Sequence, residues 1–234
     1  MNEDALMAVY AETCFTYDIR GRMLLTNEPY AEARRPAPRL FLGGTPTGQV
    51  VRIGATMPDD LAHDVEETIA CHPRSDALQP PMTLLRAVQE ALAHHATITQ
   101  EEGGPAYHFP PSLPSVGEAI RLTEENVEVA RQTFPWLIEE WADWGPCYAV
   151  IREGAAVSVC FSSRIGTDAE AAGVETLPEF RGRGHAAAVT AAWATAVRER
   201  GHIPLYGTTW ENSASQGVAR HLALIRFGAC MTWA

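Results

Sequence analysis

Long apolar runs, basic charge and paired metal ligands are all scarce in this sequence of 234 residues. Eighteen consecutive apolar residues occur nowhere, so no segment is expected to cross a membrane as a helix. Lysine and arginine number 18 against 29 aspartate and glutamate residues, a formal net charge of -11. This balance argues against a nucleic-acid partner, because phosphate binding needs a basic face. The eight histidines show no paired ligand spacing, so no metal is expected.

Cysteine is also sparse and scattered. The odd number of five leaves at least one cysteine unpaired in any intramolecular disulfide scheme. The first residues carry Glu3 and Asp4 rather than a basic and then apolar leader pattern. Together these features predict a protein of the reducing cytoplasm.

The composition is that of a globular chain, with 46% apolar and 20% charged residues. The length allows two modest domains. Glycine and proline are concentrated in Thr99–Ala119, where they would interrupt a helix. We therefore expect a domain boundary near residue 113, between an N-terminal unit of residues 1–112 and a C-terminal unit of residues 113–234.

The N-terminal unit is predicted to be a small α+β domain. Two segments read as hairpins, Cys14–Thr26 and Arg39–Ala55, each with a glycine at a plausible turn. A helix is expected from Asp59 or Asp60 to about Ala70, and a second helix from Pro81 to near His95.

The C-terminal unit alternates strand and helix patterns. Thr123 is a candidate N-cap, because Glu124 and Glu125 follow it. A further helix is expected to contain Trp136 and Trp141, and Trp144 follows them. These three tryptophans could pack in the core, or they could form a wall of an acceptor pocket. The expected strands are Ala119–Thr123, a hairpin of Cys147–Gly154 with Ala155–Ile165, Ala169–Leu177, Ile203–Trp210 and Ala229–Trp233.

Two helices are expected near the end of the chain. The first, from about Gly184 to Arg200, carries Val189, Trp193, Ala196 and Val197 on one face and should place the strands on either side of it parallel. The second helix should open with the capping-box spacing of Ser213 and Gln216, and bury Val218, Leu222 and Ile225. The unit is therefore of mixed α/β class.

The most informative segment is a loop that leads from a strand directly into the first of these helices. Gly182 and Gly184 leave the unpaired amides at the helix start open to an anion. Arg181 and Arg183 add cationic forks suited to phosphate. The loop therefore predicts a phosphate-bearing cofactor.

The order of strand, RGRGHA loop, helix, strand, Asn212 and helix resembles the GNAT superfamily of acetyl-coenzyme A-dependent N-acetyltransferases. Arg181, Gly184 and Ala186 fit its loop motif, and the resemblance extends over the C-terminal half. It implies a mixed sheet with splayed parallel strands, preceded here by the smaller α+β domain. The segment GRGHAA also fits a loose dinucleotide-binding motif. That interpretation fails, because only about fifty residues follow Gly184, too few for a doubly wound sheet.

The resemblance also implies a site for acetyl-coenzyme A. The backbone of Val174, Glu175 and Thr176 would pair with the pantetheine arm as if it were an added strand. Asn212 and Ser215 would open the next helix beside the cofactor. The pyrophosphate would lie on the loop made of Arg181, Gly182, Arg183, Gly184, His185 and Ala186.

For catalysis, the resemblance suggests a base that deprotonates the acceptor ammonium. Glu170, eleven residues before Arg181, is the leading candidate and Glu175 the second. The family's usual tyrosine acid is replaced by Ala219, which leaves Tyr206, Tyr148 or water as donor, or departure of the thiolate without assistance.

The expected function is that of an acyltransferase that moves an acetyl group from acetyl-coenzyme A to a primary amine of a small molecule. The acidic chain weakly favours a cationic amine. The alternative is a non-catalytic acyl-coenzyme A-binding sensor, in keeping with the missing tyrosine. The N-terminal unit is open to three roles: a degenerate second copy of the same fold, a lid over the acceptor, or an oligomerisation surface such as that of a homodimer.

Overall fold

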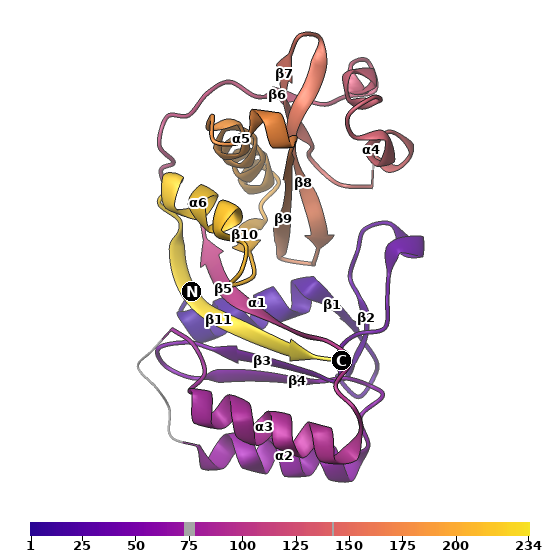
Figure 1. Ribbon diagram of the computed structural model, residues 1–234, viewed down its shortest axis with the longest axis vertical. Helices are drawn as coiled ribbons and strands as arrows, with labels where there is room; N and C mark the ends of the chain where they lie inside the picture. Colours follow the sequence, from indigo (N-terminus) through magenta and orange to yellow (C-terminus); the bar gives the residue numbers. More distant parts are fainter. Residues whose placement is uncertain (73–77, 142) are drawn as a thin grey trace.

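The computed structural model describes residues 1–72, 78–141 and 143–234 (Figure 1). Its helices are α1 (Glu3–Cys14), α2 (Asp59–Cys71), α3 (Met82–His95), α4 (Pro135–Glu140), α5 (His185–Glu199) and α6 (Ser213–His221), with short 3-10 turns at Ala31–Ala33, Val127–Ala130 and Pro178–Phe180. Its strands are β1 (Phe15–Tyr17), β2 (Met23–Thr26), β3 (Leu40–Gly44), β4 (Gln49–Ile53), β5 (Glu101–His108), β6 (Ile120–Arg121), β7 (Tyr148–Arg152), β8 (Ala155–Ile165), β9 (Ala169–Thr176), β10 (Ile203–Gly207) and β11 (Ile225–Trp233).

One large mixed sheet runs through both halves of the chain. Its nine strands follow the order β4-β3-β11-β5-β10-β9-β8-β7-β6, and β1 and β2 form a separate hairpin. β9 and β10 are parallel, as predicted from the helix between them, whereas the other described pairs in this sheet are antiparallel. The predicted mixed α+β class is confirmed.

The predicted hairpins are present. Strands β3 and β4 pair within residues 39–55, and β7 and β8 turn at Glu153 and Gly154. Both turn residues have positive φ angles, 52° and 81°, as expected of a tight two-residue hairpin turn.

Strand β5 corrects the expectation that residues 99–119 would only connect two units. Its glycines permit close approach: a Cβ on Gly103 would overlap the Met231 sulfur, and a Cβ on Gly104 would overlap the Thr208 carbonyl. β5 pairs with β10 on one side and β11 on the other. The predicted boundary at residue 113 lies between β5 and β6 and stays a prediction.

Helix α1 was not expected from the sequence. Asn2 caps it, because the Oδ1 of Asn2 accepts a hydrogen bond of 2.9 Å from the Ala5 amide, and Glu3 and Asp4 lie in its positive first turn. Met7 and Ala11 are fully buried against the sheet. The helix therefore stabilises the face that it covers.

The helices cover the two faces of the sheet. Phe41 and Leu205 pack in the cluster that contains α1, whereas Leu40 and Leu42 pack against α2 and α3. Tyr206, the neighbour of Leu205, packs in the cluster that contains α5 and α6. Because neighbouring residues of a strand point to opposite faces, α1 lies on one face, and α2, α3, α5 and α6 lie on the other (Figure 1).

The predicted face of α5 is confirmed, since its four named residues are all buried. Two helix-end predictions were wrong. Thr123 does not cap a helix; its amide donates to Asn126 Oδ1 at 2.8 Å, before a 3-10 turn. Ile225 begins β11 with 44% of its surface exposed, so it does not extend the buried face of α6.

Within the described residues, no helix combines the length and apolar character needed to cross a membrane.

Candidate functional site

A cavity of about 1050 Å³ opens where the two parallel strands separate. β9 and β10 pair only from Ala169 to Ala171 and from Ile203 to Leu205. Beyond these residues Ala172, Val174 and Thr176 line one wall of the cavity, and Tyr206, Gly207 and Thr208 line the other. The separation of the parallel strands, predicted from the resemblance, is therefore present.

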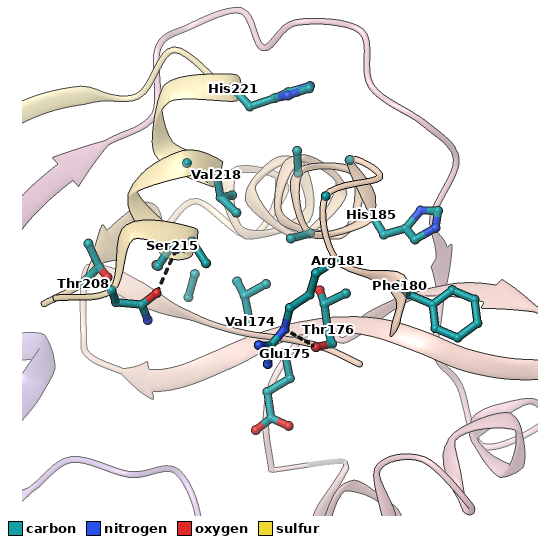
Figure 2. A pocket seen from close by; sticks show the side chains of 18 of the residues that line it. Val174, Glu175, Thr176, Phe180, Arg181, His185, Thr208, Ser215, Val218 and His221 are labelled. Atoms are coloured by element: carbon teal, nitrogen blue, oxygen red, sulfur yellow. Dashed lines mark hydrogen bonds between the residues drawn. The ribbon is translucent and has the colours of Figure 1, made fainter. Parts of the chain in front are cut away.

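The separated part of β9 has one free edge. Its other edge pairs with β8 as far as Thr176. Among the described residues, no strand pairs with residues 172–176 on the cavity side. Such an edge offers main-chain donors and acceptors to an extended ligand, in the manner of an added strand. The Thr176 carbonyl is partly satisfied, because Arg181 Nε donates to it at 3.2 Å (Figure 2).

The amides at the start of α5 face the same cavity. Gly184 is the N-cap, with φ 80° and no side-chain cap hydrogen bond, and Gly182 has φ 73°. Neither glycine has an atom within 4 Å of the place that a Cβ would occupy. The positive φ angles strongly favour glycine, and the open space keeps the helix N-terminus accessible to an anion.

The side chains around this loop divide into two groups. Arg181, His185 and Ala186 line the cavity, whereas Arg183 does not and places its guanidinium over the Phe180 ring, 5.3 Å from the centroid. The pKa of His185 is lowered, first by burial and then by Arg152 and Arg183. A lowered pKa keeps this imidazole neutral near pH 7, so it adds hydrogen-bonding capacity rather than charge.

The start of α6 forms the wall opposite β9. The N-cap is Asn212, whose Oδ1 accepts a hydrogen bond of 2.9 Å from the Ser215 amide (Figure 2). Ser213 was expected to be the cap and is not. Gln216 also does not close a capping box, because its amide donates to the carbonyls of Thr209 and Trp210. Asn212 and Ser215 both line the cavity, as predicted.

Tyr206 connects β10 to α6 beneath the cavity. Its hydroxyl lies 2.6 Å from Ser215 Oγ, and its side chain is almost fully buried. Burial raises the pKa of Tyr206 to about 12, against the smaller opposing effect of the Ser215 hydrogen bond. The phenol therefore keeps its proton at any pH at which the protein would work, and it can donate that proton. Tyr148, the other candidate donor, does not line this cavity.

The two candidate bases lie in different surroundings. Glu170 is fully buried, accepts from Ser162 Oγ, and lies 2.9 Å from His202 Nδ1 and 3.5 Å from Arg200. It is not among the residues that line the cavity. Its contacts are those of a structural carboxylate that joins β8 and β9 to the chain after α5.

Glu175 does line the cavity. Its side chain points away from α5 and from the loop that precedes this helix (Figure 2). Desolvation raises the pKa of Glu175, and a hydrogen bond with the Trp136 side chain partly opposes this shift. A carboxylate with a raised pKa is a stronger proton acceptor.

Sequence reasoning missed several cavity residues, because they follow the ends of regular elements and have no motif of their own. They include Thr133 and Phe134 before α4 and Thr208 and Thr209 after β10. The tryptophans favour the packing interpretation: the Trp136 and Trp144 rings lie 5.7 Å apart and both meet the Phe161 ring edge-on.

Comparison with known proteins finds a family model that matches part of the chain. The model of the GNAT acetyltransferase family matches residues 134–226. No curated protein matches the chain. These 93 residues contain the parallel strands, the loop before α5 and the start of α6.

Solved structures with a similar fold carry the same family name. A GNAT-family protein of Novosphingobium aromaticivorans is 20% identical, with TM-score 0.48, over 58% of this chain and 65% of its own, so the chain spans just under two thirds of that protein. A GNAT-like protein of Streptococcus suis is 18% identical, with TM-score 0.47, over 67% of this chain and 77% of its own. One from Kribbella flavida is 14% identical, with TM-score 0.47, over 100% of this chain and 95% of its own.

The resemblance predicted for the C-terminal half is thus confirmed: residues 134–226 match the model of the GNAT acetyltransferase family.

Proposed function

We propose that this protein transfers an acetyl group from acetyl-coenzyme A to a primary amine of a small molecule. The observation that carries the proposal is the meeting of three features in one cavity. These are the free edge of β9, the uncapped amides of α5 and the separation of β10 from β9. The family match supports acyl transfer, and these features support the choice of donor.

The residues present fit coenzyme A. Its pyrophosphate needs several donors and no intruding side chain, and the α5 amides with Gly182, Gly184 and Arg181 offer that arrangement. Its pantetheine arm carries amide groups that can pair with the free β9 edge at Val174 and Thr176. When bound, it would supply an acetyl thioester. Arg183 would contribute only to the local positive potential.

Two residues of the chain would then transfer protons, one as the base and one as the acid. The amine attacks the carbonyl carbon of the thioester, so that a C–N bond forms and the C–S bond breaks. Glu175 accepts the proton that the ammonium loses, directly or through water, and Tyr206 donates a proton to the departing sulfur. Glu175 is favoured over Glu170, because it is among the residues that line the cavity and has no ion pair in the described residues.

For the cellular compartment and the oligomeric state, we propose what the sequence led us to expect. A reducing cytoplasm accords with the five cysteines, which all lie in the described residues and form no disulfide. A homodimer would be compatible with the proposal and is not needed for it.

Binding and turnover should be measured separately. Calorimetry with acetyl-coenzyme A and with coenzyme A tests the site, and release of free thiol in the presence of a panel of primary amines tests the reaction. We expect binding, together with thiol release that depends on the amine. Tight binding without thiol release on any amine would favour the non-catalytic sensor, and absence of binding would overturn both.

A further inference from the structure

A second cavity, of about 470 Å³, lies on the face of the sheet that α1 covers. Its walls come mainly from the N-terminal half: Tyr10 and Cys14 of α1, Phe15 of β1, Phe41 of β3 and Gly104 of β5. Both phenylalanines are nearly buried. The cavity therefore has an apolar aromatic floor of a size that suits a small ligand.

The two cavities meet at the end of β10. Gly207, Thr208 and Thr209 line both of them. The first cavity lies on the side of α5 and α6 and the second on the side of α1, so these three residues separate compartments on opposite faces of the sheet. A Cβ on Gly207 would overlap the hydroxyl of Tyr10, so the two walls are closely fitted.

Thr208 carries an unsatisfied group at this junction. Its Oγ1 is buried and has no hydrogen-bond partner in the described part of the chain. An unpaired buried hydroxyl is unfavourable, because it has given up its hydrogen bonds to water without replacing them. The Thr208 hydroxyl lies at the boundary between the two cavities. It can therefore form a hydrogen bond with a ligand that enters one of them.

The charges of the second cavity differ from the acidic character of the chain. Its charged side chains are Arg35, Arg164 and Glu102. Arg164 is paired, because its guanidinium lies 2.5 Å from Glu28 Oε1. Arg35 has no carboxylate partner among the described residues and donates only to the carbonyls of Glu32 and Arg34. Arg35 is exposed, and an exposed guanidinium that lines a cavity and keeps unused donors suits a carboxylate that enters from solvent.

From these observations we infer that the second cavity binds the acceptor, and that the acceptor is an amine that also carries a carboxylate, with the chemistry of an amino acid or a short peptide. The inference rests on the acetyl transfer proposed above. Arg35 holds the carboxylate, the aromatic floor holds an apolar side chain, and the amine reaches the Thr208 end, where the first cavity begins. This assignment replaces the cationic acceptor that net charge alone would favour.

Pairs of acceptors that differ only in the carboxylate test the proposed acceptor class. Glycyl-phenylalanine and its C-terminal amide differ in the charge at the far end, whereas their amines have nearly the same basicity. We expect the acid to have a KM lower by about tenfold or more, the value of one charged hydrogen bond. Equal KM values for acid and amide, and likewise for phenylalanine and phenylalaninamide, would overturn the inference while leaving acetyl transfer intact.

The variant Arg35→Gln tests the residue. It should raise KM for the acid and leave KM for the amide unchanged, so that the preference between them is lost. A purely structural role in the loop would instead change both substrates equally. Arg86→Gln removes the same charge from the exposed side of α3 and should alter neither value.

Calorimetry measures binding without turnover. The parent should bind glycyl-phenylalanine about tenfold or more tightly than its C-terminal amide, and Arg35→Gln should bind the two equally. This preference without any acetyl transfer would support the ligand site and refute the proposed reaction. Transfer to the acid with equal binding of acid and amide to the parent would place the acceptor elsewhere.

Discussion

Gly104 of β5 lies directly against the main chain of Thr208, so close that a Cβ atom on Gly104 would overlap the Thr208 carbonyl oxygen. A strand from the N-terminal half thereby sets the position of the wall that both cavities share. The absence of a side chain at residue 104 is thus a requirement of the site as well as of the fold.

Gly104→Ala should destabilise the protein and impair acetyl transfer. The atom in the way belongs to backbone, so β5 or the 208–209 segment must move, at a cost of about 1–3 kcal/mol. Thermal unfolding measures the loss. Gly117→Ala is the matched control, because a Cβ there meets only Ala188 at 3.9 Å. Equal unfolding temperatures for the two variants would contradict the close approach.

Gly184→Leu should abolish binding of coenzyme A, because a side chain at the N-cap of α5 would enter the space in front of the free amides. A positive φ of 80° adds strain of about 1–2 kcal/mol. Gly201→Leu, at the other end of α5 with φ 82°, should carry similar strain but retain binding. Calorimetry distinguishes them, and an unchanged dissociation constant for Gly184→Leu would remove this loop from the site.

Glu175→Gln should slow turnover and remove the acidic limb of the pH profile of kcat/KM, with little effect on coenzyme A affinity. The direction in which Glu175→Gln changes the stability of the protein also follows from the pKa of Glu175. Because the folded pKa of Glu175 is raised, the parent loses stability as the pH rises through that value. The variant should therefore melt higher than the parent near pH 7, and this advantage should vanish below the pKa of the unfolded state.

Glu170→Gln serves as the comparison. It replaces a buried carboxylate that Ser162, His202 and Arg200 surround, so it should lower stability by several kcal/mol. The acidic limb should remain in whatever folded protein is recovered. Loss of that limb in Glu170→Gln, with its retention in Glu175→Gln, would reverse the assignment of the base.

Tyr206→Phe should reduce kcat by about tenfold to a hundredfold, the lower range for a general acid because a thiolate leaves readily. The dissociation constant of coenzyme A should not change. Because the pKa of Tyr206 is about 12, its ionisation should not lower the parent's rate below pH 10. Tyr148→Phe, outside the cavity, is the control; an equal loss of kcat in both variants would rule out a specific role for Tyr206.

The chain of residues 113–234, expressed alone, should not fold cooperatively. Without β5, strands β10 and β11 lose the strand that lies between them and expose two unpaired edges. Co-expression with residues 1–112 should restore solubility, and two-dimensional NMR would report the folded state. A well-dispersed spectrum of the short chain alone would support the division into independent domains near residue 113.

Local patterns predicted the elements around the first cavity well. The α5 face, the parallel strands and the loop with Gly182 and Gly184 all depend on neighbouring residues, and each lies where periodicity and turn chemistry indicated. The cap of α6 was misplaced by one residue, because Asn212 and Ser213 are both good caps and only the fold selects between them.

The rest depends on contacts between distant segments. β5 could not be recognised, because Gly103, Gly104 and Pro105 have the composition of a loop and are tolerated only where Thr208 and Met231 approach them. The second cavity gathers α1, β3, β5 and β11, none of which carries a motif. No local pattern predicts that Arg35 and Thr208 line the same space.

The position of β11 in the sheet also determines when the sheet can fold. This strand is the last in the chain, yet it lies between β3 and β5, more than a hundred residues earlier. During synthesis, both early strands must wait with open edges until β11 has left the ribosome. Such a high contact order implies slow folding and a period of exposure to aggregation, in which a chaperone would matter most.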